Sequence, residues 1–138
     1  MNSLLFAIAF ALPTIGADAA SKAIQEELKK LEGRWAFVLP EGQEGNTFHL
    51  EFAGKDWTLV FSEKNKVRGK LTIHPGTKPA CIDFVLENGT FVEAIYKIER
   101  EVLTIRIGEA NVKQRPTEFP SGDEPKEKTL AFKKVKPT

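Results

Sequence analysis

The sequence predicts an all-β protein: an eight-stranded antiparallel up-and-down barrel with a short helix before its first strand. Apolar residues alternate with polar ones along eight short segments, which is the period of a strand with one buried face. Most of these segments are joined by short polar turns. Consecutive hairpins favour an antiparallel meander, and closure of the meander removes its two exposed edges. A two-sheet sandwich is the alternative arrangement.

The composition is typical of one folded domain. Of the 138 residues, 41% are hydrophobic, which suffices for a core, and 28% are charged. The 20 basic and 19 acidic residues leave a net charge of +1 and form no long block of one sign. We therefore expect no nucleic-acid partner, because phosphate binding needs a concentrated basic face.

The N-terminus has the pattern of an export signal. The uncharged apolar run over residues 4–16 is shorter than the roughly 20 residues that span a bilayer. Ala17-Asp18-Ala19 follows it as a small-x-small cleavage pattern. We expect residues 1–19 to be a cleaved signal peptide and residues 20–138 to be an exported domain, periplasmic or extracellular, with no membrane attachment after cleavage. The alternative is a retained apolar helix, since the first three residues carry no Lys or Arg.

The helix is predicted between Ser21 and Leu31. Ile24, Leu28 and Leu31 repeat at i, i+4 and i+7 on one face. Ser21 is suited to cap this helix and Gly33 to end it.

Eight strands follow the helix. Asn88-Gly89 predicts a hairpin turn, because both turn positions need positive φ. The predicted strands are 34–39, 48–52, 57–61, 67–74, 82–86, 91–98, 102–107 and 129–135.

Residues 108–128 carry no clear strand or helix pattern. Pro116, Pro120 and Pro125 exclude a long helix there. A connection of this length in a small domain is usually either functional or mobile. The segment is therefore a candidate contact for a protein partner, with a disordered hairpin tip as the alternative.

Five segments resemble the lipocalin-like domain family of unknown function that is abundant in exported planctomycete proteins. Residues 33–35 (GRW) resemble the Gly-x-Trp motif of the first lipocalin strand. Residues 78–84 (KPACIDF) resemble the K-P-x-x-I-D-apolar segment of the narrower family, and residues 115–119 (RPTEF) resemble its R-P-x-x-F motif. Residues 95–98 and 103–105 resemble its paired strands. In order and spacing, the resemblance covers essentially the whole mature chain.

The resemblance implies a lipocalin-like barrel more than any one function. Its structural signature falls on Gly33, Trp35, Asp83, Tyr96, Arg115 and Phe119. Two departures stand out. The turn Glu99-Arg100-Glu101 lacks the family's Gly, which can change the turn type. Lys134 stands where an Arg often packs over the early Trp.

Asp83 lies within an apolar strand. Strand alternation would point it outward, whereas a partly buried carboxylate would need a partner. Arg115 is the candidate partner, and the pair would pin the long loop to the barrel as a structural clamp. Arg115 could instead pair locally with Glu118.

The large aromatic residues are predicted mostly to point into the barrel. They then either fill the interior or line a cavity for an apolar ligand. The chain is short for a roomy barrel, which favours a filled or small interior. The aromatic residues are Trp35, Trp57, Phe48, Phe52, Phe61, Phe84 and Phe91. The ligand-binding candidates among them are Trp57, Phe48, Phe61 and Phe84.

Catalytic and metal-binding signatures are absent from the sequence. His49 and His74 have no His or Cys at ligand spacing, so no metal site is expected. Cys81 is the single cysteine and lies in an apolar stretch, which predicts a buried small residue, with a reactive thiol or an intermolecular disulfide as the alternatives. No nucleophile-base motif, cofactor motif or phosphate loop is present, so an enzyme ranks last.

Two functions remain ahead of an enzyme. The first, which we favour, is an exported lipocalin-like protein that binds a small apolar molecule in its barrel. The second is a structural or protein-interaction module with a filled barrel, acting through residues 108–128 or through the barrel wall. An open apolar cavity in the barrel would favour the first.

Overall fold

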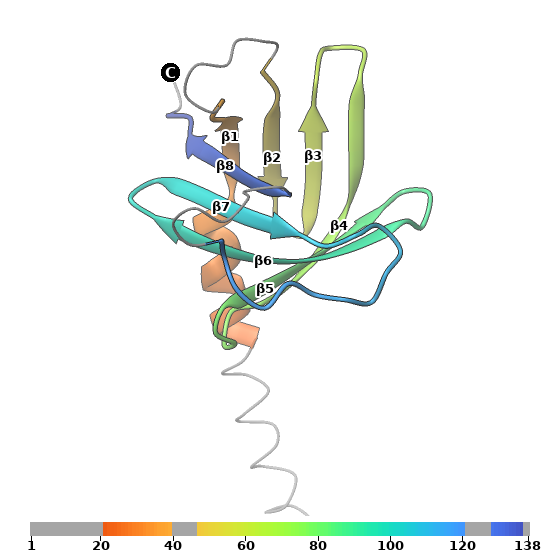
Figure 1. Ribbon diagram of the computed structural model, residues 1–138. Helices are drawn as coiled ribbons and strands as arrows, with labels where there is room; N and C mark the ends of the chain where they lie inside the picture. Colours follow the sequence, from red (N-terminus) through yellow and green to blue (C-terminus); the bar gives the residue numbers. More distant parts are fainter. Residues whose placement is uncertain (1–20, 40–46, 121–127, 137–138) are drawn as a thin grey trace, which may run out of the picture.

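The alternating segments form eight strands that close into one antiparallel barrel, with a short helix at one end (Figure 1). The computed structural model describes residues 21–39, 47–120 and 128–136. The predicted signal peptide, residues 1–19, lies outside them. The strands are β1 (Gly33–Phe37), β2 (His49–Ala53), β3 (Asp56–Val60), β4 (Lys66–His74), β5 (Ala80–Leu86), β6 (Phe91–Glu99), β7 (Val102–Ile107) and β8 (Thr129–Lys134). The predicted fold class is confirmed, and the sandwich alternative is wrong.

The barrel closes through the pairing of its first and last strands. Each strand pairs with the next one in sequence, and β1 also pairs with β8. Trp35 of β1 is opposite Leu50 of β2 on one side and Lys134 of β8 on the other. Closure leaves each of the eight strands with two hydrogen-bonded neighbours, which removes the open edges of a meander.

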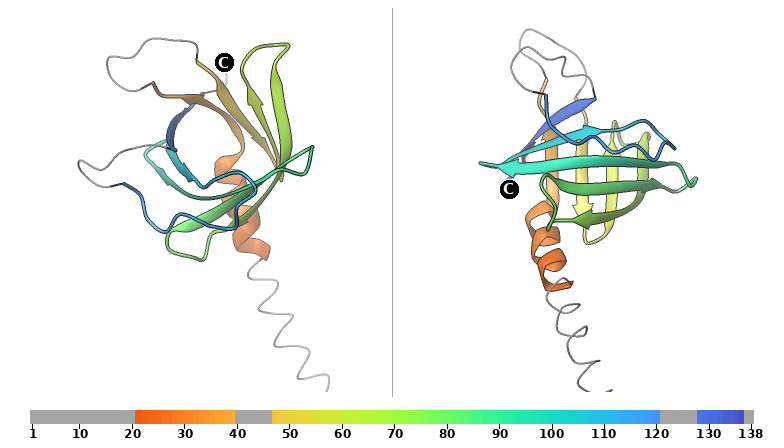
Figure 2. Two further views of the ribbon diagram at one scale, coloured as in Figure 1. Left: turned by 45° about the vertical axis from the view of Figure 1, so that its right-hand side comes forward. Right: turned by 60° about the horizontal axis from the view of Figure 1, so that its bottom comes forward.

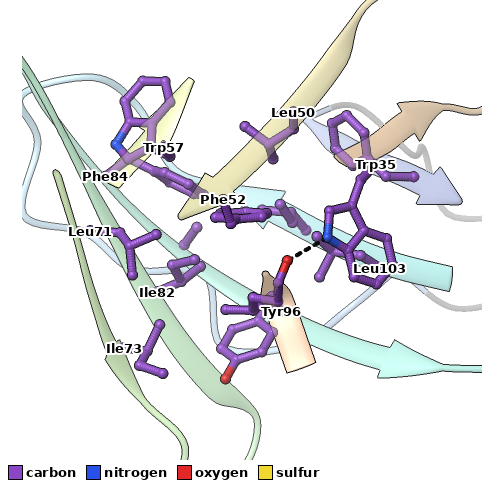
Figure 3. Close-up of a cluster of buried hydrophobic side chains, with 14 residues drawn as sticks. Trp35, Leu50, Phe52, Trp57, Leu71, Ile73, Ile82, Phe84, Tyr96 and Leu103 are labelled. Carbon is purple, nitrogen blue, oxygen red and sulfur yellow. Dashed lines mark hydrogen bonds between the residues drawn. The ribbon is translucent and has the colours of Figure 1, made fainter. Parts of the chain in front are cut away.

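The core of the barrel consists mainly of side chains from alternate positions of the strands (Figure 3). Along β5, Ile82 and Phe84 are buried and Val85 is exposed, as period-two alternation requires. Tyr96 and Phe132 are each 1% exposed and join the same core. The other buried members are Leu31, Trp35, Leu50, Phe52, Trp57, Leu71, Ile73, Ile82, Phe84, Ala94, Leu103 and Ile105.

The helix over residues 21–31 packs its apolar face on one end of the barrel, and it is drawn in orange in Figure 1. Leu31 is fully buried, while Ile24 and Leu28 pack against the core. Ser21, expected as the cap, is itself helical. Gly33 has a φ of 117° and turns the chain into β1, which a residue with a side chain adopts only with strain.

Two hairpin turns differ from simple expectation. Asn88-Gly89 lies in a four-residue connection between Leu86 and Phe91, in which Gly89 N–H donates to the Leu86 carbonyl. The predicted hairpin is present, but only Gly89 of the pair has positive φ, so the expectation of positive φ at both positions is wrong. By contrast, Arg100 and Glu101 both have positive φ. The β6–β7 turn therefore keeps a left-handed geometry without a glycine.

Residues 108–120 form a strap on the outside of the barrel, drawn in blue in Figures 1 and 2. Gly108 N–H donates to the Glu93 carbonyl and Asn111 N–H to the Phe91 carbonyl. The strap thus continues the pairing of β6 beyond the end of β7. Within the described residues, no helix is both long and apolar enough to cross a bilayer.

Candidate functional site

An apolar cavity of about 190 Å³ lies inside the barrel. Strand topology places it towards the end of the barrel opposite the helix, because most of its lining residues lie near the strand ends beside the 61–65, 87–90 and 108–128 connections. The helix packs at the opposite end. The described residues that line the cavity are Phe48, Leu50, Trp57, Leu59, Phe84, Leu86, Val92, Ile105, Ile107, Leu130 and Phe132.

Trp57 and Phe84 form one wall of the cavity (Figure 3). Their rings pack edge to face, with centroids 5.4 Å apart and planes at 85°, which is a favoured aromatic geometry. The Trp57 Nε1–H donates to the Lys70 carbonyl at 2.8 Å. The one polar atom of this indole is therefore satisfied by the backbone, and the ring presents carbon to the cavity.

Gly69 makes room for the Trp57 ring. A Cβ at residue 69 would lie 2.9 Å from Trp57 Cζ2 and 2.0 Å from the Val85 carbonyl oxygen. Both contacts are shorter than a real Cβ allows. The glycine therefore permits β4 to approach β5 closely while the indole lies against the strand, which is a common use of glycine within a barrel.

Phe48 forms the second aromatic wall. Its ring stacks on Phe37 with centroids 4.5 Å apart and meets Phe132 edge to face at 5.9 Å. Phe61 lies on its other side, with centroids 5.5 Å apart. Phe48 thus connects the core to the surface at this end of the barrel.

Three of the four predicted ligand-binding residues line the cavity: Trp57, Phe48 and Phe84. Phe61 does not, and it is 46% exposed. β3 ends at Val60, so the alternation that predicted an inward Phe61 no longer holds there. Phe91 is likewise outside the core, because its neighbour Val92 takes the inward position.

The other cavity residues were not singled out from the sequence. Apart from Phe132, they are aliphatic side chains at inward positions of the strands, such as Leu59, Val92 and Ile107. Alternation indicates that they point inward, but it does not indicate which inward side chains leave space between them.

Apolar character extends through the whole interior. Among the described residues, no polar or charged one is buried. Tyr96 is buried and is counted here with the aromatic residues. A polar group placed in the cavity would lose its water and find no partner on the walls. The cavity therefore suits an apolar ligand.

Arg115 and Asp83 meet on the outer wall, as the clamp hypothesis predicts. Arg115 Nη2 is 2.7 Å from Asp83 Oδ1 and 3.8 Å from Glu93 Oε2. The Arg115 Nη1–H donates to the Ala94 carbonyl at 2.8 Å. Asp83 Oδ1 is buried and receives no aligned hydrogen bond, so this contact is an ion pair rather than a directed bond.

Further contacts hold the strap on the barrel and pack the last strand against Trp35. Phe119 lies 4.7 Å from Lys97 Nζ, in cation–π contact. Glu118 contributes its carbonyl oxygen to Arg106. Lys134 Nζ lies 4.7 Å from the Trp35 ring centroid, the packing that the resemblance implies. None of these contacts faces the cavity.

Tyr96 connects β6 to the helix. Its hydroxyl donates to Glu27 Oε1 at 2.9 Å. Burial, with the neighbouring Glu27 charge, raises the pKa of Tyr96 far above its usual range. Trp35 makes a similar connection, since its Nε1–H donates to the Leu31 carbonyl at 2.7 Å, the dashed line in Figure 3.

The histidines and the cysteine lie outside the cavity. His74 is exposed, with Nε2 3.5 Å from Asp83 Oδ2, and His49 is half-buried. Cys81 is half-buried on the outer face, 3.3 Å from Thr77 Oγ1, rather than buried as expected. In the described part of the chain, no three His, Cys, Asp or Glu residues are grouped to hold a metal ion.

No family model, curated protein or solved structure matches this chain. The functional argument therefore depends on the geometry of the barrel.

Proposed function

We propose that this protein binds a small apolar molecule inside its barrel. The observation that carries the proposal is the 190 Å³ cavity, whose described lining is entirely apolar. Concave apolar sites at the mouth of a β-barrel are a common place for small ligands. An empty space of this size also forgoes packing contacts, which a bound apolar molecule would restore.

The resemblance to exported lipocalin-like domains supports the same proposal. The closed eight-stranded barrel, with Gly33 and Trp35 at the start of β1 and Lys134 over the indole, is the arrangement that this resemblance implies. We propose further that the chain acts outside the cytoplasm, because residues 1–19 have the sequence pattern of an export signal. A role as carrier or scavenger would fit an exported binder.

A protein-interaction role through residues 108–128 is the second candidate. The strap is held to the barrel by the Arg115 contacts and by backbone bonds to β6. These contacts account for the position of the strap on the barrel without a partner protein. No feature of the described residues 108–120 and 128 favours this role over ligand binding.

Native mass spectrometry tests the proposal. The chain is purified from its own host without denaturation, alongside a Val92→Phe variant that fills the cavity and a Val85→Phe control. Val92 lines the cavity, whereas Val85 is 40% exposed on the outside. We expect an added mass that is lost on unfolding in the wild type and the control, but not in Val92→Phe. A bare polypeptide mass in all three would argue against a resident ligand.

A further inference from the structure

We propose that the barrel selects an uncharged hydrophobe no larger than a single six-membered ring with a short alkyl substituent. This inference rests on the proposed function and specifies its ligand class. Two properties of the cavity carry it: its volume, and the absence of polar partners along its described walls.

The volume limits how large a molecule can lie wholly inside the barrel. Engineered apolar cavities of about 150 Å³ stay dry and take up benzene. At about 190 Å³, the barrel holds such a ring with little room to spare. To lie wholly inside, three fused rings or a long acyl chain would have to displace packed side chains, and close-packed interiors resist such shifts.

The walls limit that adjustment. Trp57 is held by its bond to the Lys70 carbonyl and by Gly69 behind its ring. Phe48 packs against both Phe37 and Phe132, which also contact each other. The two aromatic walls are fixed by these contacts. Adjustment to a bound ligand is therefore left to the aliphatic side chains of the lining, such as Val92.

The lack of polar groups on the cavity walls excludes charged ligands. The Trp57 Nε1–H already has a backbone acceptor, and no charged side chain is buried among the described residues. A carboxylate carried into the cavity would be desolvated without a partner. A hydroxyl would suffer the same loss to a smaller degree, so phenol should bind more weakly than toluene.

Differential scanning calorimetry with defined probes tests this selectivity, because a ligand that binds only the folded chain raises its melting temperature. Toluene, phenol and benzoate form a series of similar size and increasing polarity. 1-Aminoanthracene and dodecanoate test size. We expect toluene to raise the melting temperature, phenol to bind about tenfold or more weakly, and the other three to produce no shift.

Matched variants locate the binding. The toluene shift should disappear in Val92→Phe and persist in Val85→Phe. If Val92→Phe does not fold, Phe84→Leu provides the reverse test, because it enlarges the cavity. The affinity for butylbenzene relative to toluene should then rise, and an unchanged ratio would overturn the size argument.

The outcomes separate the two proposals. Binding of 1-aminoanthracene, dodecanoate or benzoate that Val92→Phe abolishes would overturn the ligand class while leaving barrel binding intact. No shift with any of the five probes would overturn both. A toluene shift that Val92→Phe leaves unchanged would place the binding elsewhere and likewise overturn both.

Discussion

Arg115 in the strap and Asp83 in β5 form an ion pair, with Arg115 Nη2 2.7 Å from Asp83 Oδ1. Both side chains are about one quarter exposed, at 25% and 24%. The Arg115 guanidinium also donates to the Ala94 carbonyl of β6. One side chain therefore ties residues 108–120 to two strands of the barrel wall.

Replacement of Arg115 by Ala should loosen the strap. The change leaves Asp83 Oδ1 buried without its cation and should lower the free energy of unfolding by about 1–3 kcal/mol. Limited proteolysis should then cut residues 108–120 faster. Lys113→Ala, an exposed change in the same segment, is the control. Equal cleavage of the two variants would mean that Arg115 is not the clamp.

Trp35 should be among the most sensitive positions in the barrel. It is 1% exposed and donates to the Leu31 carbonyl. Trp35→Ala should reduce stability by about 3–5 kcal/mol, as expected for a large core aromatic. Val135→Ala, at a 38% exposed site, should change stability by less than about 0.5 kcal/mol. Urea denaturation of both variants measures the difference, and a small loss at Trp35 would contradict its core position.

Gly69 should not tolerate a methyl group. A Cβ there meets the Val85 carbonyl oxygen at 2.0 Å and Trp57 at 2.9 Å. Gly69→Ala should therefore destabilise by about 1–3 kcal/mol or more. Gly76→Ala is the matched control, since its Cβ would meet nothing within 4 Å. Thermal unfolding compares them, and similar melting temperatures would show that β4 can move away from β5.

The raised pKa of Tyr96 predicts a loss of folding stability at alkaline pH. The folded state raises the pKa of Tyr96, so its contribution is complete below the unfolded pKa of about 10 and is lost as pH rises above that value. Tyr96→Phe should remove this part of the alkaline loss. Tyr96 is the single tyrosine of the chain, so phenolate absorbance follows it alone. A midpoint near pH 10 in the folded protein would contradict its burial.

Much of the fold could be predicted from the sequence because one face of each strand is buried. Trp57, Phe84 and Tyr96 follow that alternation into the interior. Phe61 breaks it, because the strand ends one residue earlier. Asn88-Gly89 lies in the predicted hairpin connection between Leu86 and Phe91, but only Gly89 has the positive φ expected at both positions. Local turn chemistry indicates the hairpin but not its backbone geometry.

The site could be predicted only in part. Arg115 and Asp83 were recognisable as a pair of opposite charges, one of them in an apolar strand. The cavity was not recognisable in the same way, because its volume depends on how facing side chains interlock. The close approach at Gly69 and the stacking of Phe37 on Phe48 are relations across strands. These relations have no local sequence signal.

Methyl NMR during a toluene titration tests the central claim most directly. Ligand inside the barrel should shift the methyl signals of residues that line the cavity, such as Leu59, Val92 and Ile107. The methyl signals of Ile24, which packs at the helix end, should not move. Shifts confined to the lining methyls are the predicted result. Saturating toluene that leaves those methyls unshifted would contradict the binding of a small uncharged hydrophobe in the barrel.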